Sequence, residues 1–254
     1  MAELLCVKDL TKVYGKRGAV TRALDGVDLS LEAGEYVGIM GASGSGKTTL
    51  LNCISTIDRP TSGSIQVDGE ELTGLRGRAL TRFRRERLGF IFQDCNLLDT
   101  LTAFENIALS LSILRTPAAQ IRDRVEETAE LLGIGDCLDK YPYQMSGGQQ
   151  RCAAARAIVT RPALVLADEP TGALDSKSSR LLLERLEVLN RERGATILMV
   201  THDAFTASCC RRVVFLRDGK IFAQLERDGG DRRALFQQII RVVTQLGREM
   251  EDVL

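Results

Sequence analysis

The sequence lacks several features that would point to common protein classes. Its 254 residues include no tryptophan and one histidine, and 34 basic side chains balance 34 acidic ones, so the formal charge is zero. A protein that holds nucleic acid over a broad basic face needs an excess of Lys and Arg, and we therefore expect no nucleic-acid partner. The length is sufficient for a hydrophobic core that needs no disulfide bonds.

Cysteine spacing and hydrophobic runs are equally limited. The seven cysteines are odd in number, show no C-x-x-C spacing and have no histidine close enough in sequence to complete a zinc site. We expect small, mostly buried thiols in a reducing cytosol. The most apolar stretches, 163–167 and 195–200, are five or six residues long, whereas a spanning helix needs about 20. The N-terminal residues lack the basic start and apolar run of a signal peptide, so we expect neither a leader nor a membrane span.

Short apolar runs alternate with helical patterns along the chain, which predicts an α/β fold with a largely parallel central sheet. Tyr36–Met40, Ala163–Ala167 and Thr196–Val200 are continuously apolar, as expected of strands buried on both faces. Ser178–Arg193 lies between the last two strands and has the apolar spacing of a helix. This order predicts a right-handed strand–helix–strand unit.

Other segments have different patterns. Alternating apolar and polar residues predict half-exposed antiparallel strands at Leu4–Val13, Val27–Leu31 and Ser64–Val67. Asp218-Gly219 predicts a hairpin between strands at 213–216 and 221–224. From about Asp94 to Thr160 the pattern is helical, with a start signal at Thr116-Pro117 and a stop at Gly133. We therefore predict a core formed by 1–93 and 161–228 and a helical subdomain at about 94–160.

The last segment, 229–254, is predicted to add an amphipathic helix to this domain. Leu235, Ile239, Val242 and Leu246 share one helical face, and Asp231 can cap the helix. We favour packing of this helix on its own domain over a partner-binding role.

The clearest functional motif is Gly41–Thr48, which matches G-x-x-x-x-G-K-[ST] between a predicted buried strand and a helix. Glycines let the backbone wrap a phosphate, and the amides of 43–48 point inward at a helix N-terminus. Lys47 would meet the β- and γ-phosphates, and the Thr48 hydroxyl would ligate Mg²⁺. We expect nucleotide contacts from Ser43, Gly44, Ser45, Gly46, Lys47, Thr48 and Thr49.

Two carboxylates follow the predicted strand at 163–167. Asp168 and Glu169 stand at its carboxyl end, where ligands bind in open α/β sheets. Asp168 suits Mg²⁺, through water, and Glu169 suits the role of general base or water-orienting residue. Such a pair is weak evidence alone and becomes strong beside the phosphate-binding loop.

A third motif, Ser146-Gly147-Gly148-Gln149-Gln150, stands at the predicted start of a helix and offers amides for a second anion contact. With it, the sequence resembles the ATP-binding cassette (ABC) ATPases over nearly its whole length. The resemblance rests on an ordered set: Tyr14, Gly41–Thr48, Gln93, Ser146–Gln149, Asp168-Glu169, Ala173-Leu174-Asp175 and His202.

The resemblance implies a P-loop NTPase (RecA-like) core with an antiparallel β subdomain and an inserted α-helical subdomain, and ATP hydrolysis with Mg²⁺. Tyr14 would stack on adenine, and Gln93 would ligate Mg²⁺ and face the attacking water. Ser146 and Gly148, with Gly147 and Gln149 beside them, would contact the ATP of a second copy in a head-to-tail homodimer.

The same resemblance implies that Asp175 crosses the dimer interface and that His202 holds the γ-phosphate. A lone histidine is more often solvated or in the core than functional. His202, however, comes two positions after Val200, at the carboxyl end of a predicted buried strand on the same sheet edge as Glu169. We therefore favour the functional interpretation.

Longer segments of the sequence resemble one subgroup of the ABC ATPases in particular. Residues 88–111 and 141–178 resemble the ATPases of macrolide, lipoprotein-release and bacitracin-type systems, and 201–221 with the terminal helix resemble the bacitracin and antimicrobial-peptide resistance branch. This implies a cytoplasmic subunit, peripheral on the inner face of the membrane, that powers a separate permease with a large extracellular domain. Leu97–Asn106 would lie near that permease. The alternatives are a lipoprotein-release or macrolide-type complex, a non-transport regulator of a membrane protein, and a soluble ABC ATPase of DNA repair or translation.

Two further features remain. The subgroup pattern has one more residue between the signature glutamine and Arg151, and a missing residue rotates the rest of a helix by about 100°. Either the helix begins one residue later here or its packing is altered.

The second feature is an arginine cluster between Arg76 and Arg87. We favour a solvated helix face, near anionic headgroups, over nucleic-acid binding, because the net charge is zero.

Overall fold

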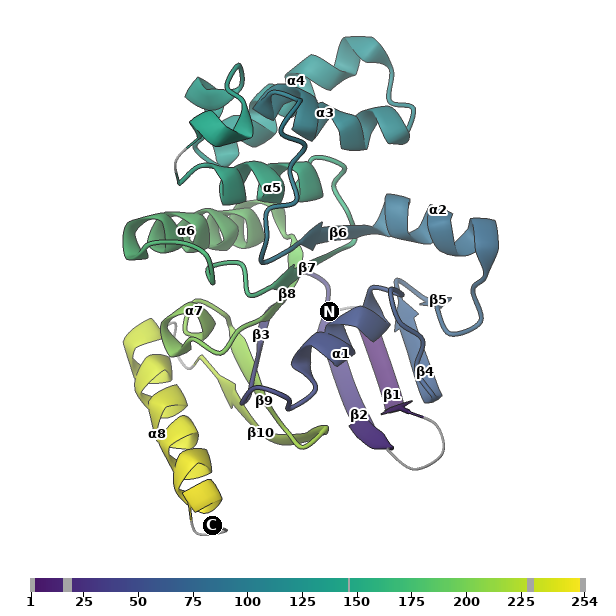
Figure 1. Ribbon diagram of the computed structural model, residues 1–254, viewed down its shortest axis with the longest axis vertical. Helices are drawn as coiled ribbons and strands as arrows, with labels where there is room; N and C mark the ends of the chain where they lie inside the picture. Colours follow the sequence, from purple (N-terminus) through teal and green to yellow (C-terminus); the bar gives the residue numbers. More distant parts are fainter. Residues whose placement is uncertain (1–2, 16–19, 146, 228–230, 252–254) are drawn as a thin grey trace.

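The computed structural model describes residues 3–15, 20–145, 147–227 and 231–251, with the backbone alone beyond residue 245. Two sheets and the helices around them make up the molecule (Figure 1). The larger sheet has six strands in the order β10-β9-β3-β8-β7-β6. Its strands are β3 (Tyr36–Met40), β6 (Leu88–Ile91), β7 (Leu164–Asp168), β8 (Thr196–Val200), β9 (Arg212–Arg217) and β10 (Lys220–Glu226).

This sheet is parallel except at one edge. β6, β7, β8, β3 and β9 run parallel, and β10 pairs antiparallel with β9 across the predicted Asp218-Gly219 turn. Because parallel strands end at a common edge, the segments that follow β3, β7 and β8 lie together. The predicted buried strands are thus confirmed, with β7 shifted by one residue.

The smaller sheet is antiparallel, as the alternation predicts. Its order is β2-β1-β4-β5, formed by β1 (Glu3–Tyr14), β2 (Thr21–Glu32), β4 (Ser62–Val67) and β5 (Glu70–Glu71). β1 and β2 are paired along most of their length with several register shifts. β2 begins six residues earlier than expected because its first half, at the sheet edge, is polar and partly exposed.

The two faces of the large sheet pack on different layers. On β8, Leu198 and Val200 join the core shared with the small sheet and α1 (Lys47–Ile54). Ile197 and Met199 point the other way, into a core shared with α5 (Gln149–Ile158) and α6 (Ser176–Arg193). This period-2 division explains why the strand is apolar at every position.

A group of helices forms one end of the molecule (Figure 1). It contains α3 (Ala103–Ile113), α4 (Ala118–Leu131), the short helices η1 (Gly135–Cys137) and η2 (Pro142–Gln144), and α5. The predicted start of α4 is wrong in detail: Pro117, not Thr116, is at the cap position and makes no side-chain cap. Gly133 follows its end with a φ of 64°, the left-handed conformation that ends helices.

The arginine cluster and the C-terminal segment are both helical. α2 (Gly77–Arg87) buries only Phe83, so its arginines form a solvated face as predicted. α8 (Arg232–Glu251) begins after Asp231, whose carboxylate accepts from the amides of Arg233 and Ala234.

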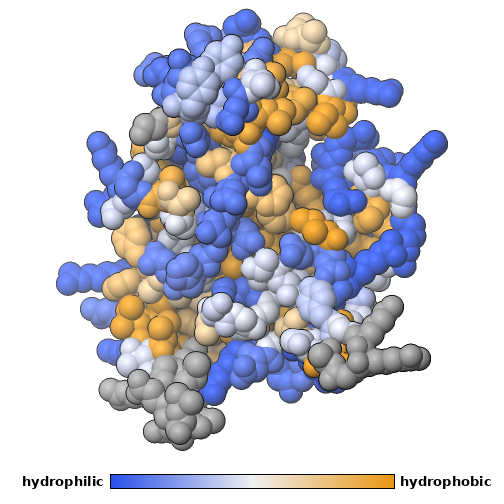
Figure 2. All heavy atoms as spheres, viewed as in Figure 1, coloured by the Kyte–Doolittle hydropathy of each residue, from blue (hydrophilic) through white to orange (hydrophobic). Residues whose placement is uncertain are grey.

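α8 packs on its own domain through Leu235 and Ile239, which are 1% and 0% exposed. Leu246 of the predicted face lies outside the described side chains. The outer part of the helix is partly apolar (Figure 2), with Ile240 and Val243 each 42% exposed. Within the described residues, no helix is long and apolar enough to cross a membrane.

Candidate nucleotide-binding site

The predicted phosphate-binding loop connects β3 to α1 and has a conformation that requires glycine. Gly46, just before α1, has a φ of 104°, and a Cβ there would lie 2.4 Å from the carbonyl oxygen of Ala23. Such a contact excludes any side chain at this position. The loop therefore keeps its backbone amides at the N-terminus of α1, where the helix dipole favours an anion.

Lys47 is held over this loop. Its ammonium donates to the carbonyl oxygens of Gly41 and Ala42, each at 2.9 Å, and the residue is 8% exposed. Burial lowers the pKa of Lys47, while the charges of Glu169 and Asp168 oppose that shift. The lysine thus lies between the loop and the carboxylates at the end of β7.

The carboxyl ends of β7 and β8 bring the two predicted catalytic residues into contact. His202 Nδ1 lies 2.8 Å from Glu169 Oε1, and the His202 amide donates to Glu169 Oε2 at 3.3 Å. The Glu169 side chain is 15% exposed and that of His202 is 71% exposed. Glu169 also has a φ of 45°, a strained conformation for this residue type that often marks a functional site.

Asp168 offers a buried oxygen suited to a cation. Among the described residues, Asp168 Oδ1 and Ser45 Oγ are both buried and find no hydrogen-bond partner. Burial raises the pKa of Asp168, helped by the charge of Glu169 and opposed by Lys47. Mg²⁺ prefers oxygen ligands such as carboxylates and hydroxyls. The Asp168 oxygen, which has no hydrogen-bond partner, and the Thr48 hydroxyl at the start of α1 are of this kind and fit Mg²⁺. No group of three or more His, Cys, Asp or Glu that could hold a metal occurs within the described ranges.

Gln93 follows β6 and is exposed, and its side chain lies beside the loop after Glu169. A Cβ added at Gly172 would come within 3.2 Å of Gln93 Nε2. The hydroxyl of Thr171 in the same loop lies 3.0 Å from that of Thr206, which follows His202. The structure thus brings Gln93, Glu169 and His202 to one region.

Tyr14, expected to stack on adenine, is 41% exposed and held on two sides. Its hydroxyl donates to Asp58 Oδ2 at 2.6 Å, and the ammonium of Lys12 lies 4.7 Å from the ring centroid. Lys12 also pairs with Asp58 at 2.6 Å. Burial, and then the bond to Asp58, raise the pKa of Tyr14, and a hydroxyl contact with Thr49 opposes them. Tyr14 therefore lies near the phosphate-binding helix.

The signature motif is only partly described. Ser146 lies outside the described residues. A Cβ at Gly147 would lie 2.7 Å from Ser178 Oγ on α6, so this loop packs against the first turn of α6. Gly148 caps α5, which begins at Gln149. Asp175 caps α6 by accepting from the amide and hydroxyl of Ser178.

Sequence reasoning missed several residues that support the site. Lys12 and Asp58 are 46 positions apart, and Thr171 and Thr206 are 35 apart, so no local pattern signals these pairs. Gln150 is 1% exposed and donates to the carbonyl oxygen of Phe92 at 2.6 Å, next to Gln93. Gln150 is a polar residue on an otherwise apolar helix face, and this pattern is the sequence signal that a buried hydrogen bond to Gln150 leaves.

The fold and the site together define a P-loop nucleotidase: a phosphate-binding loop after a parallel strand, with acidic residues at the end of another strand in the same sheet. Residues 24–172 match the family described as ABC transporter. The bacitracin export ATP-binding protein BceA of Halalkalibacterium halodurans is 48% identical over 250 residues, covering 98% of this chain and 99% of that protein. The ABC transporter ATP-binding protein YxdL of Bacillus subtilis is 48% identical over 255 residues, covering 100% of this chain and 98% of its own length.

Solved structures of ATP-binding cassettes have the same fold as this chain. The dimeric ATP-binding cassette MJ0796, bound to ADP and Pi, aligns with a TM-score of 0.80 at 38% identity, over 89% of this chain and 100% of that chain. The transporter component cbiO1 from Clostridium perfringens aligns with a TM-score of 0.82 at 27% identity, over 99% of this chain and 100% of that chain. The chain belongs to the ABC transporter family, as an ATP-binding and ATP-hydrolysing subunit. The fold class and the resemblance predicted from the sequence are confirmed.

Proposed function

We propose that this subunit powers a separate integral-membrane permease for export of, or resistance to, bacitracin-like antimicrobial peptides. The observation that carries the site chemistry is the meeting of Lys47, Asp168, Glu169 and His202 at one edge of the large sheet. The branch is supported by the end-to-end alignment with BceA. The methionine import ATP-binding protein of Salmonella choleraesuis, at 43% identity, is covered over only 65% of its own length.

Each residue has a proposed role in hydrolysis. Lys47 and the loop Ser43–Thr49 hold the phosphates, and Tyr14 stacks on the adenine. Glu169 orients the attacking water and accepts its proton, and His202 holds the γ-phosphate. The contact of 2.8 Å between His202 Nδ1 and Glu169 Oε1 holds these two side chains beside each other.

Thr48, Gln93 and Asp168 would hold Mg²⁺, which when bound neutralises phosphate charge. The unpartnered Oδ1 of Asp168 is the support from the structure for this assignment.

We also propose that the active form is an ATP-dependent head-to-tail homodimer. Ser146, Gly147, Gly148 and Gln149 would complete the partner's nucleotide site, and Asp175 would cross the interface. The dimeric solved cassettes at 38% identity support this assembly. The proposal is also supported by Gly147, which lies against the first turn of α6, the helix that Asp175 caps, so that the two candidate interface segments are neighbours.

The permease partner is proposed to have a large extracellular domain and to hold this subunit peripherally at the inner face of the membrane, in the cytoplasm. We further propose a division into a core of 1–93 and 161–228, a helical subdomain at about 94–160 that faces the permease through Leu97–Asn106, and the extension 229–254.

The Glu169→Gln variant tests the catalytic assignment. The amide keeps the shape of the side chain but cannot accept a proton, so turnover should fall by ~10²–10⁴-fold. Because ATP is then bound but not cleaved, the variant should form a stable dimer with ATP and Mg²⁺ in size-exclusion chromatography. Glu184→Gln, on an exposed position of α6, is the matched control and should behave as wild type. Turnover within tenfold of wild type would contradict the role of Glu169, and a strictly monomeric profile would contradict the dimer.

A further inference from the structure

The segment that carries His202 continues into a very short helix. α7 (Ala204–Ala207) has four residues, so its own hydrogen bonds satisfy few of its terminal groups. Its N-terminal amides are capped by Asp203, which accepts from the amide of Thr206 at 2.7 Å and that of Phe205 at 3.4 Å. A helix of this length depends on contacts from outside to hold its position.

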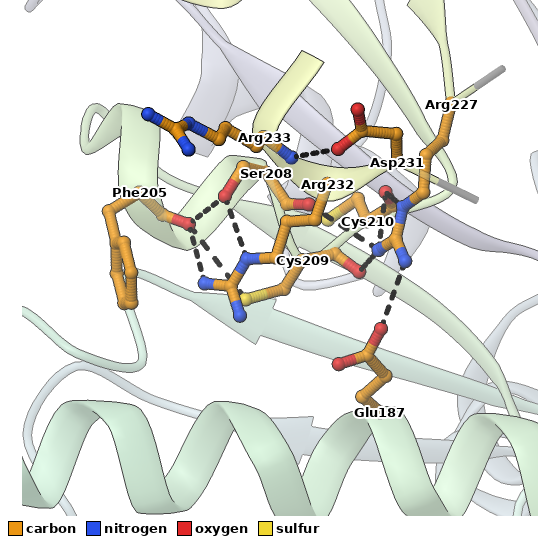
Figure 3. A network of polar contacts seen from close by, with 9 residues as sticks. All are labelled: Glu187, Phe205, Ser208, Cys209, Cys210, Arg227, Asp231, Arg232 and Arg233. Carbon is orange, nitrogen blue, oxygen red and sulfur yellow. Dashed lines mark hydrogen bonds and ion pairs between the residues drawn. The ribbon is translucent and has the colours of Figure 1, made fainter. Parts of the chain in front are cut away.

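Two arginines from the C-terminal part of the chain supply those contacts (Figure 3). Arg227, directly after β10, donates to the carbonyl oxygens of Ser208, Cys209 and Cys210. Its side chain is 15% exposed and also pairs with Glu187 of α6 at 3.0 Å. Positive charge at the carbonyl end of a helix is favourable, and the planar guanidinium can serve several carbonyls at once.

Arg232, the first residue of α8, completes the arrangement. Its Nε donates to Ser208 Oγ at 3.1 Å, and a terminal nitrogen donates to the Phe205 carbonyl oxygen at 3.3 Å. The guanidinium carbon lies 4.4 Å from the centroid of the Phe205 ring. The first turn of α8 is thus fastened to α7, in addition to the burial of Leu235 against the same region.

The same short helix also contacts the loop that follows Glu169. Thr206 contacts Thr171 in the loop after Glu169, with 3.0 Å between the hydroxyls. His202 itself stands two residues before α7 and touches Glu169. A continuous set of contacts therefore runs from α8 through α7 to the side chains proposed to act on the γ-phosphate.

We propose that Arg227 and Arg232 are positioning residues for His202: by fixing α7, the C-terminal segment sets the position of His202 against Glu169. The inference rests on the catalytic role proposed for His202. Arg227 and α8 thus have a part in the reaction beyond completing the core, and α8 becomes an element through which turnover can be altered without a change in the nucleotide pocket.

The sole histidine of the chain provides a direct readout, because in tag-free protein its ring signals in a ¹H–¹³C NMR spectrum need no assignment. The test variant is Arg232→Ala. The matched control is Arg233→Ala, which removes the same charge from the same turn at an exposed position. Arg232→Lys keeps the charge but not the forked geometry, and thermal melting verifies that each variant is folded.

We expect Arg232→Ala to shift or broaden the His202 signals and to lower the turnover number by about 3- to 10-fold, with the KM for ATP unchanged. Arg232→Lys should recover only part of the loss, and Arg233→Ala should match wild type. Unchanged His202 signals in folded Arg232→Ala would overturn the positioning role, whatever happens to turnover. A His202→Ala variant separates the two proposals: wild-type turnover there would sink the catalytic role of His202, whereas the NMR shift reports the contact itself.

Discussion

At the scale of single residues, the carboxylate of Asp168 is placed at a cost to the fold. It is at the end of a buried strand, beside another carboxylate, and its Oδ1 has no hydrogen-bond partner among the described residues. Burial raises its pKa, which means that the folded state disfavours the charged form. Such a group is retained for function rather than for stability.

We therefore predict that Asp168→Asn stabilises the nucleotide-free protein while it abolishes turnover that depends on Mg²⁺. Removing a carboxylate charge that burial disfavours is expected to contribute on the order of 1 kcal/mol, or about 2–4 °C in Tm for a chain of this size. Because the folded pKa is above the unfolded one, the ionised form destabilises at neutral pH, and the penalty is relieved as pH falls through the raised pKa. The stability gap between variant and wild type should accordingly be largest at neutral pH and shrink towards about pH 4.

Calorimetry without nucleotide measures this gap. Asp123→Asn, at an exposed position on α4, controls for the substitution itself. A variant less stable than wild type at neutral pH would show that Asp168 supports the fold.

The sequence predicts which residues meet in the site where those residues follow the carboxyl ends of parallel strands. Asp168, Glu169 and His202 could be predicted to meet because parallel strands finish at one edge, and they do. The contact between Tyr14 and Asp58 could not be predicted. Asp58 follows α1 and meets the Tyr14 hydroxyl only through tertiary packing against the small sheet, and no periodicity records such a contact. Lys12, by contrast, lies two residues before Tyr14 on β1, the spacing that puts two side chains on one face of a strand.

At the scale of elements, α8 is attached by a narrow apolar face and by the arginine contacts of its first turn. Ile239 is 0% exposed, and Ile240, its neighbour, is 42% exposed. The two positions differ in burial and not in side-chain chemistry, so they measure what the packed face of the helix contributes.

We predict that Ile239→Ala lowers the free energy of unfolding by about 2–4 kcal/mol, because it removes buried methylenes and leaves a cavity. Ile240→Ala should cost less than about 1 kcal/mol, since much of that side chain is in water. Urea denaturation of the two variants makes the comparison. Equal losses at both positions would show that α8 does not pack as described.

Element boundaries show where sequence signals compete. β3 and β8 match the predicted ranges because an apolar run between polar residues has clear ends. α4 begins one residue later than predicted: Pro117 occupies the cap position, with ψ near 135°, and so does not serve as the first helical residue. At α3, Thr102 and Glu105 form a capping box, and their spacing of three residues before an apolar run is a signal that the sequence itself carries.

At the scale of the whole molecule, the helical end and the core are joined through the segment that carries Gln93. Gln150 of α5 donates to the Phe92 carbonyl oxygen at 2.6 Å and accepts from the Cys95 thiol at 2.7 Å. Arg156, further along α5, donates to the carbonyl oxygens of Cys95 and Asn96. A movement of α5, which begins at the signature motif, must therefore move the loop after β6.

Gln150→Met tests this connection, because methionine has a similar volume but cannot donate to Phe92. We predict a turnover number lower by about 3- to 10-fold, since Gln93 loses its fixed position, and a KM for ATP close to wild type, since Lys47 and its loop are untouched. Loss of the two side-chain hydrogen bonds of Gln150 should also cost about 1–3 kcal/mol of stability. Gln120→Met, at an exposed position on α4, is the matched control. A rise in KM with unchanged turnover would place the effect in nucleotide binding and show that α5 and the Gln93 loop move independently.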